Sequence, residues 1–287
     1  MAKCVNGREI AKGSNNKVKN EIQMCCLKKG RSPKLVSLSV GYSEDAEIYM
    51  NMQKKVSDYV GVEFVSQKLP DGISQDELIG HIEKLNLDKS VTSVIIQKPL
   101  PKNIDHNITA SKILPEKDAE GITPCNLGRI FRKEADIVPC TPGAVMKILT
   151  SCDVGLYGKE VVIVGHSAIV GKPLSLMMLN ETATVTVCHV GTAERGDIMS
   201  HTRKADILIV AVGKAGMVKS DWIKEGAVVI DVGINKVGNT IQGDVDFLDT
   251  EKKASIITPV PGGVGPVTVS ILMRNVLRAY RNQNVKI

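Results

Sequence analysis

The sequence predicts an α/β protein with two domains, and three observations lead to this prediction. The chain has 287 residues, about twice the usual length of one domain. Short apolar runs rich in β-branched residues alternate with longer amphipathic segments, a pattern typical of parallel sheets covered by helices. Residues 115–142 are rich in proline, glycine and asparagine, which predicts a loop where the chain crosses between the domains.

The first half of the chain predicts three strands and three helices. Ser74 and Glu77 precede an apolar run at the spacing of a capping box, so we expect a helix to begin at Ser74. The expected strands are Lys34–Val40, Gly61–Ser66 and Val91–Gln97, and the expected helices are Asn15–Lys29, Ser43–Tyr59 and Ser74–Leu87.

The second half predicts a longer βα series of the Rossmann type. We expect the closing helix, from about Gly265 to Arg281, to pack back on the first domain. The predicted division is therefore an N-terminal α/β domain of residues 1–140 with the returning helix at 265–287, and a Rossmann-type domain of residues 141–264. The expected strands are Glu160–Val164, Thr184–Cys188, Asp206–Val212, Ala227–Asp231 and Ser255–Thr258.

Composition excludes several classes of protein. The longest apolar stretches, such as Ile207–Gly213, are too short to cross a membrane. The 37 basic and 31 acidic residues give a net charge of +6, but the basic residues are dispersed and aromatic residues are only 3%, so nucleic-acid binding is not expected. The start shows no secretory signal, and seven cysteines without a CxxC pair favour a reduced compartment. We expect a cytoplasmic protein with no metal site.

A glycine loop between Val161 and Pro173 is the strongest indication of a nucleotide. An apolar strand runs into Gly165 and a helix follows from about Gly171, so backbone N–H groups at the helix start would face a phosphate. The alternative is a tight turn with no ligand. The next strand ends at Cys188 without an acidic residue, so nothing there would repel the 2′-phosphate of NADP. His166, His189 and Arg195 are available to contact that phosphate.

Other segments give weaker indications. Residues 258–268 hold three glycines and three prolines, more than a plain strand-to-helix turn needs, which favours contact with a ligand. In the first domain, Tyr49 and Gln53 lie four residues apart on one helix face. Taken singly, Tyr49 and the segments Ile96–Pro101 and Asp118–Gly121 are equally consistent with packing and ordinary turns.

Taken together, these segments resemble the bifunctional methylenetetrahydrofolate dehydrogenase/methenyltetrahydrofolate cyclohydrolase family over nearly the whole chain. The resemblance implies two α/β domains with a cleft between them, folate in the cleft, NADP or sometimes NAD on the C-terminal domain, and a homodimer. The motifs that carry it, besides Tyr49, are Gln97–Pro101, Asp118–Gly121, Asn126–Arg129, Pro139–Pro142, the Gly165 loop, Asp231–Asn235 and Pro261–Pro266.

The resemblance also implies the roles of individual residues. It assigns catalysis to four residues, Tyr49, Gln53, Gln97 and Glu120. The substrate would contact these residues together with Ile96, Lys98, Pro261, Gly262, Gly263 and Gly265. The cofactor would contact Gly165, His166, Ser167, Val190, Ile234 and Thr268.

This chain departs from the family pattern at four of these positions. Gln53 stands where the family has the lysine tied to acid–base chemistry, and Glu120 where it has an aspartate. His166 and Val190 stand where many members have arginine and serine, which removes two partners for a 2′-phosphate.

Gln53 bears differently on the two reactions of the family. Hydride removal needs positioning above all, whereas hydrolysis needs a group that titrates near the working pH, and glutamine has none. We therefore expect the dehydrogenase to be retained and the cyclohydrolase to be weak or lost. The alternatives are a hydrolase-only enzyme, a non-catalytic folate- or nucleotide-binding protein, and a site that never depended on position 53.

Overall fold

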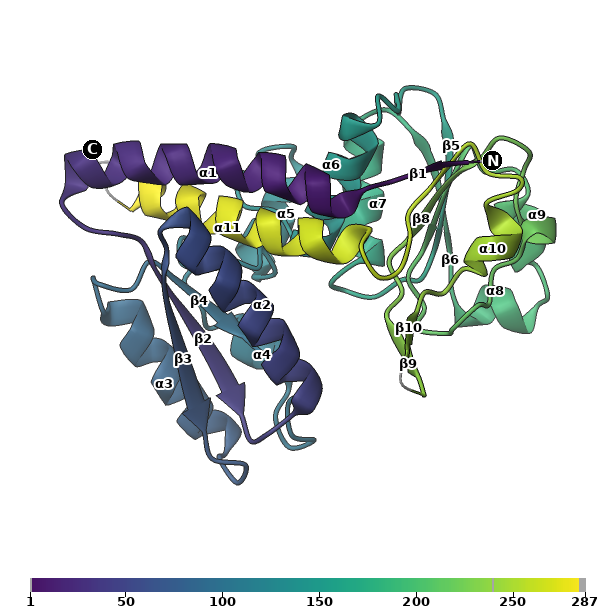
Figure 1. The fold of residues 1–287 in the computed structure, drawn as a ribbon. Helices are drawn as coiled ribbons and strands as arrows, with labels where there is room; N and C mark the ends of the chain where they lie inside the picture. The colour runs from purple at the N-terminus through teal and green to yellow at the C-terminus, as the bar shows by residue number, and fades with distance from the viewer. Residues whose placement is uncertain (1, 239, 284–287) are drawn as a thin grey trace. The chain divides into compact units, whose positions relative to one another are not determined.

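The computed structural model describes residues 2–238 and 240–283, which form two compact units (Figure 1). The N-terminal unit comprises Lys12–Cys140 and the chain from Val269 onward. The C-terminal unit comprises Thr141–Thr268 and the residues up to Ala11. Each unit has its own parallel sheet, so the predicted α/β class is confirmed.

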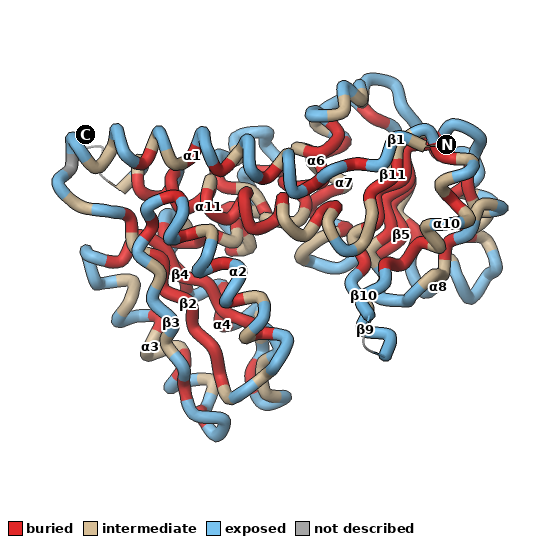
Figure 2. The backbone as a smooth tube through the Cα atoms, in the orientation of Figure 1, coloured by how far each residue is buried: buried red, intermediate tan, exposed pale blue. Residues whose placement is uncertain are grey.

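A three-stranded sheet forms the centre of the N-terminal unit. Its order is β3 (Glu63–Leu69), β2 (Lys34–Val40), β4 (Ser93–Ile96), and β2 is parallel to both neighbours. Strand β2 is buried from Leu35 to Val40, as Figure 2 shows. The predicted bounds of β2 are confirmed, and its burial on both faces is the pattern of a central parallel strand.

Helices complete this unit and supply its core. They are most of α1 (Gly7–Lys29), α2 (Glu44–Val60), α3 (Gln75–Leu87), α4 (His106–Ala110), α5 (Pro124–Phe131) and most of α11 (Val264–Asn282). Ser74 and Glu77 form the predicted capping box at the start of α3. From α11, Leu272, Met273, Val276 and Leu277 pack in one cluster with Leu35 and Ile95. Residues 284–287 of the expected last helix lie outside the described residues.

The segment predicted as a loop at residues 115–142 contains a helix, so that prediction is wrong in part. Helix α5 (Pro124–Phe131) begins after Thr123, whose side chain accepts a hydrogen bond from Asn126 N. Proline at the first helical position needs no N–H partner and fits the helical φ. Helix α6 (Cys140–Ser151) also begins inside this segment. Pro124, Pro139 and Pro142 lie at the starts of these two helices, whereas Pro115 lies in a turn.

The C-terminal unit contains a six-stranded parallel sheet. Its order is β1 (Lys3–Cys4), β11 (Ile256–Ile257), β8 (Val228–Asp231), β7 (Ile207–Val210), β5 (Glu160–Val164), β6 (Thr184–Cys188). Counted from β5, the strand order is 2-1-3-4-5, the flavodoxin-like variant of the doubly wound fold. In such sheets the strand order reverses between the first and third strands, here β5 and β7, and ligands bind outside the carboxyl ends at that point.

Strand β1 places the start of the chain in the C-terminal unit. The predicted division put these residues in the first domain. Lys3 and Cys4 pair with Ile256 and Ile257 of β11, and two residues are too few to show a period. The remaining elements of this unit are α7 (Gly171–Asn180), α8 (Val190–Glu194), α9 (Ile198–Thr202), the 3₁₀ turn Ser220–Trp222, β9 (Asn235–Val237), β10 (Thr240–Gln242) and α10 (Phe247–Thr250). Within the part of the chain that the structure describes, no helix is long and apolar enough to cross a membrane.

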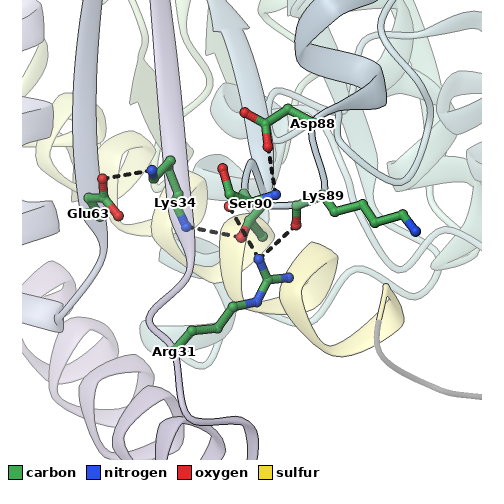
Figure 3. Close-up of polar contacts among 7 residues, drawn as sticks. Arg31, Lys34, Glu63, Asp88, Lys89 and Ser90 are labelled. Carbon is green, nitrogen blue, oxygen red and sulfur yellow. Dashed lines mark hydrogen bonds and ion pairs between the residues drawn. The ribbon is translucent and has the colours of Figure 1, made fainter.

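Polar contacts close the amino end of the N-terminal sheet (Figure 3). Lys34, the first residue of β2, forms an ion pair of 2.9 Å with Glu63, the first residue of β3. Arg31 Nη1 donates to the carbonyls of Lys89 at 2.7 Å and Ser90 at 3.3 Å. These contacts tie the turn before β4 to the start of β2. They lie at the end of the sheet opposite to the residues described below.

Two leucines of α3 test where this unit derives its stability. Leu78 is fully buried in the core beside β2, whereas Leu87 at the end of the same helix is 83% exposed. We expect Leu78→Ala to lower the free energy of unfolding by about 2–5 kcal/mol, because it leaves a cavity. Leu87→Ala should change it by no more than about 0.5 kcal/mol. Urea unfolding followed by circular dichroism measures both; equal effects would contradict the core assignment.

Candidate functional site

The carboxyl ends of β2 and β4 position one group of the predicted site residues. Gln97 N donates to Leu38 O at 2.7 Å, which extends the parallel pairing one residue beyond β4. Ile96 and Gln97 are buried, and the Lys98 side chain is exposed. Because parallel strands bring their carboxyl ends to the same edge of a sheet, this edge is the expected place for a ligand.

A chain of side-chain hydrogen bonds joins this edge to α2. The Gln97 Nε2 group donates to Gln53 Oε1 at 2.8 Å and to Ser37 Oγ at 2.9 Å. Gln53 in turn hydrogen-bonds the Tyr49 hydroxyl one turn earlier on α2. The structure therefore brings Tyr49, Gln53 and Gln97 together. Sequence reasoning missed Ser37, although a serine inside the apolar run of β2 was an available signal.

Asp118 fixes the loop that carries Glu120. Its carboxylate accepts from Gly121 N and Thr123 N, both at 2.8 Å, and from Asn126 Nδ2 at 2.9 Å. Gly121 has φ +70°, and a Cβ there would lie 2.4 Å from the carbonyl carbon of Val138. This position requires glycine for both conformation and space.

Glu120 is the carboxyl group that the loop presents to the site. Its Oε2 accepts a single long hydrogen bond, from Ile96 N at 3.4 Å. Burial raises the pKa of Glu120 to about 7, and the nearby charge of Asp118 adds to this effect. Glu120 therefore titrates near neutral pH, which is the condition for general acid–base chemistry.

Other titratable groups near Glu120 also have pKa values shifted from their usual ranges. Burial raises the pKa of the Tyr49 hydroxyl well above its usual range, with further contributions from Cys140 and Glu120. Burial also raises the pKa of the Cys140 thiol. Burial lowers the pKa of Lys98, and the charge of Glu120 partly offsets this lowering. Cys140 belongs to this cluster, and sequence analysis gave it no role although the motif that contains it was noted.

The C-terminal unit places the predicted nucleotide loop at the point where the strand order reverses. Gly165 N donates to Cys188 O at 2.9 Å, and Ser167 Oγ accepts from Val170 N at 3.1 Å. A Cβ on Gly165, whose φ is +128°, would lie 2.3 Å from Ala211 O, just beyond β7. A Cβ on Gly171 would lie 2.0 Å from Gly165 O. The loop thus needs both glycines, and its backbone leads directly into α7.

The residues after β5 and β6 form an open surface. The rings of His166 and His189 lie 5.1 Å apart, and both side chains are exposed. His189 Nδ1 accepts from Gly191 N at 3.2 Å. Val190 is 66% exposed, and no acidic residue ends β6. The end of β6 therefore carries no acidic side chain that would repel a 2′-phosphate.

Other predicted contact residues of this unit differ in their surroundings. Ile234, beyond β8, is 69% exposed, whereas Thr268 is buried and donates to Val264 O within α11. The glycines at 262 and 263 have a packing reason as well. A Cβ on Gly7 would lie 1.9 Å from Gly263 O and 2.6 Å from Gly262 O. Pro261 and Gly265 flank this close approach, and a Cβ on Gly265 would meet no atom within 4 Å.

Asp231, at the end of β8, holds the loops of this edge in place. Its carboxylate accepts from Gly233 N at 2.9 Å, Asp244 N at 3.0 Å and Val245 N at 2.9 Å. Burial nevertheless raises its pKa to about 6. Across residues 2–238 and 240–283, no three His, Cys, Asp or Glu side chains are grouped so as to hold a metal ion.

Comparison with known proteins shows that both units match the domains of one family. Residues 5–120 match the catalytic domain of tetrahydrofolate dehydrogenase/cyclohydrolase, and residues 139–284 match the NAD(P)-binding domain of the same family. The chain is 45% identical to the bifunctional protein FolD of Sulfurihydrogenibium sp. (strain YO3AOP1), with 99% of each chain covered. It is 42% identical to that of Aquifex aeolicus, with 99% of this chain and 97% of the relative covered.

Solved structures give the same result. The methylenetetrahydrofolate dehydrogenase-cyclohydrolase of Trypanosoma brucei, complexed with NADP cofactor and an inhibitor, superposes with a TM-score of 0.94 at 38% identity, covering 100% of this chain and 99% of that one. The bifunctional enzyme FolD of Campylobacter jejuni also gives 0.94, at 37% identity, with 98% and 99% covered.

The glycine loop provides a test of the nucleotide site. A methyl group at Gly171 would collide with Gly165 O, so Gly171→Ala must move the loop away from the start of α7. We expect this change to weaken binding of NADP at least tenfold, about 1.4 kcal/mol, in a calorimetric titration. Gly155→Ala is the matched control, because a Cβ there meets no atom within 4 Å. Unchanged affinity in Gly171→Ala would remove this loop from the site.

Proposed function

Since the chain belongs to the tetrahydrofolate dehydrogenase/cyclohydrolase family, we propose that it oxidises 5,10-methylenetetrahydrofolate to 5,10-methenyltetrahydrofolate with NADP, and that it hydrolyses the product only slowly. The observation that carries this proposal is the hydrogen-bonded chain of Tyr49, Gln53 and Gln97 at the edge where β2 and β4 end. The N-terminal unit would hold the folate and the C-terminal unit the dinucleotide.

The side chains of the cluster suit the oxidation. Removing a hydride from the methylene carbon leaves a cation that the substrate's own nitrogen lone pairs stabilise. The protein therefore has to position the substrate above all. The buried amides of Gln53 and Gln97 are held by each other and by Ser37, which gives them fixed orientations. Gln53 is neutral, so it places no positive charge beside the developing cation.

The same residue makes hydrolysis slow. Adding water to the methenyl cation and opening the ring requires one proton to leave and another to arrive at a nitrogen. The Gln53 amide cannot titrate in the working range. Lys54 and Lys55 follow it on α2, and both are exposed while Gln53 is buried. Neither lysine replaces it in the buried chain.

The C-terminal unit fits a nicotinamide dinucleotide. Gly165 and Gly171 provide the close backbone approach that a pyrophosphate needs before a helix. When bound, NADP supplies the hydride acceptor. The absence of an acidic residue at the end of β6 in the described chain supports NADP over NAD, and the Trypanosoma brucei relative was solved with NADP. NAD remains the second cofactor to test, because His166 replaces the family arginine and Val190 replaces the family serine.

The partners and location that we propose follow the family resemblance. The partner of the site is a folate, with or without a polyglutamate tail, and we propose a cytoplasmic homodimer that binds neither membranes nor nucleic acid. Sedimentation equilibrium measures the oligomeric state directly.

The activity can be tested in one assay. Purified protein is mixed with methylenetetrahydrofolate and either NADP or NAD, and reduced cofactor and methenyl absorbance are followed together. Reduced cofactor with accumulating methenyl product supports the proposal. Product that disappears as fast as it forms would refute slow hydrolysis. No reduced cofactor with either nucleotide would refute the dehydrogenase and favour a hydrolase-only or binding protein.

Substitution of Gln53 tests the cause of slow hydrolysis. Gln53→Lys adds a titratable amine beside the Gln97 amide, which can orient it, so hydrolysis of methenyltetrahydrofolate should rise by about 10²-fold. Gln53→Met keeps a similar volume without adding a base, and hydrolysis should not rise. Equal hydrolysis rates for the wild type and Gln53→Lys would show that position 53 does not limit this step.

A further inference from the structure

We propose that Glu120 is the proton carrier of the remaining hydrolysis, so that the loop between α4 and α5 does the work that the amide of Gln53 cannot do. This inference rests on the proposed function, since it concerns the second reaction of the same site. It is carried by the contrast between two neighbouring carboxyl groups, Asp118 and Glu120, and by the contacts that surround them.

The two carboxyl groups have different surroundings. Asp118 is fully buried, and its two oxygens accept three N–H bonds at 2.8 to 2.9 Å, so it has a structural task. Glu120 is only partly buried. It accepts one bond, from Ile96 N at 3.4 Å to Oε2, and in the described chain its Oε1 accepts none. Neighbouring carboxyl groups in unlike surroundings are a usual arrangement for proton chemistry.

The charges around Glu120 keep its proton exchangeable. The nearby carboxylate of Asp118 opposes ionisation of Glu120, whereas the Ile96 N–H and the ammonium of Lys98 favour it. With burial, these effects bring the Glu120 pKa to about 7. The group therefore accepts and returns a proton without a large cost in either direction.

The other titratable groups around Glu120 are poor carriers. Tyr49 and Cys140 have raised pKa values and hold their protons at neutral pH. His106, which lies beside Lys98, has its pKa lowered to about 4 by burial and stays neutral. The charge of Arg274 partly offsets the rise in the Cys140 pKa. The guanidinium itself stays charged, so it does not carry protons. Lys98 is the remaining rival, and the experiment below separates it from Glu120.

The proposed step balances in atoms and charge. Water attacks the methenyl carbon, a C–O bond forms, and the carboxylate of Glu120 takes one proton from that water. The C–N5 bond then breaks as Glu120 returns its proton to N5, and the carbinol hydroxyl loses its proton to solvent as the formyl C=O forms. One water is consumed and one proton is released, with no oxidation or reduction.

The experiment is a pH–rate profile of methenyltetrahydrofolate hydrolysis, with the rate in buffer alone subtracted at each pH. For the wild type, kcat/KM should rise as pH increases toward about 7 and then level, because the ionised carboxylate is the base. Glu120→Gln keeps the shape but cannot titrate, and should lower the plateau by at least 10²-fold and remove the pH dependence. Glu120→Asp withdraws the carboxylate by one methylene and should lose at least tenfold.

Controls separate this role from substrate holding. A residue that only holds the pterin would raise KM and slow hydride transfer and hydrolysis by the same factor when changed to Gln, with the pH profile kept. If Glu120 is the carrier, Lys98→Met should keep a rise of the rate with pH but move it to higher pH, because the Lys98 ammonium lowers the Glu120 pKa. If Lys98 is the carrier, the rise should disappear. Lys55→Gln, on the exposed face of α2, is the matched control and should match the wild type.

Several results would overturn the proposal. The first is a wild-type hydrolysis rate that does not exceed the rate in buffer at any pH. The second is a pH–rate profile that stays unchanged in Glu120→Gln. The third is a rise of the rate with pH that disappears in Lys98→Met. Hydride transfer to NADP is measured on the same wild-type sample. Its presence with no Glu120-dependent hydrolysis refutes this inference alone, whereas its absence refutes the proposed function.

Discussion

The carboxylate of Asp118 is the contact on which the site of the N-terminal unit depends. Its hydrogen bonds to Gly121, Thr123 and Asn126 fix the loop between α4 and α5 and support the start of α5. Asn275 of α11 supports the same loop by donating to Ala119 O at 2.8 Å. Glu120 lies inside this fixed segment, so its side chain is presented to the site at little further cost in conformational entropy. The same carboxylate also raises the pKa of Glu120, which makes it both scaffold and electrostatic neighbour.

Parallel pairing divides the tasks of the N-terminal sheet between its two ends. At the amino end, Lys34, Glu63 and Arg31 make contacts that close turns. At the carboxyl end, the chain leaves β4 with Gln97, whose side chain is turned to Gln53 and Ser37 instead of to solvent. The C-terminal sheet shows the same division, because the Gly165 loop and Asp231 both follow the carboxyl ends of strands. A mutation's effect on stability or on function should therefore depend on which end of its sheet it alters.

Sequence patterns predicted the strands, whose bounds depend on local composition. They missed several site residues, whose partners are brought close only by the fold. Strands β2, β5 and β6 have their predicted bounds, because short runs rich in apolar and β-branched residues are typical of parallel strands. Helix α5 was missed because proline marks both loops and helix starts. Tyr49, Gln53, Gln97 and Glu120 were found through the family resemblance. Ser37 and Cys140 were not, because their importance comes from neighbours 60 and 91 residues away in sequence. The task of Asp118 was also missed, although its partners Gly121 and Thr123 are close in sequence.

The pairing of Gln53 with Glu120 reflects a conflict between the two reactions of one site. A positive side chain beside the methylene carbon would oppose the cation that hydride removal creates, whereas a negative one would favour it. Hydrolysis begins from that cation and needs a base. A carboxyl group with a pKa near 7 meets both requirements, because its charged form attracts the cation and then accepts a proton from water. A lysine can be the base only after losing the charge that opposes the first reaction. The chain thus keeps its titratable group on the loop and a neutral amide on the helix, an arrangement that favours oxidation over hydrolysis.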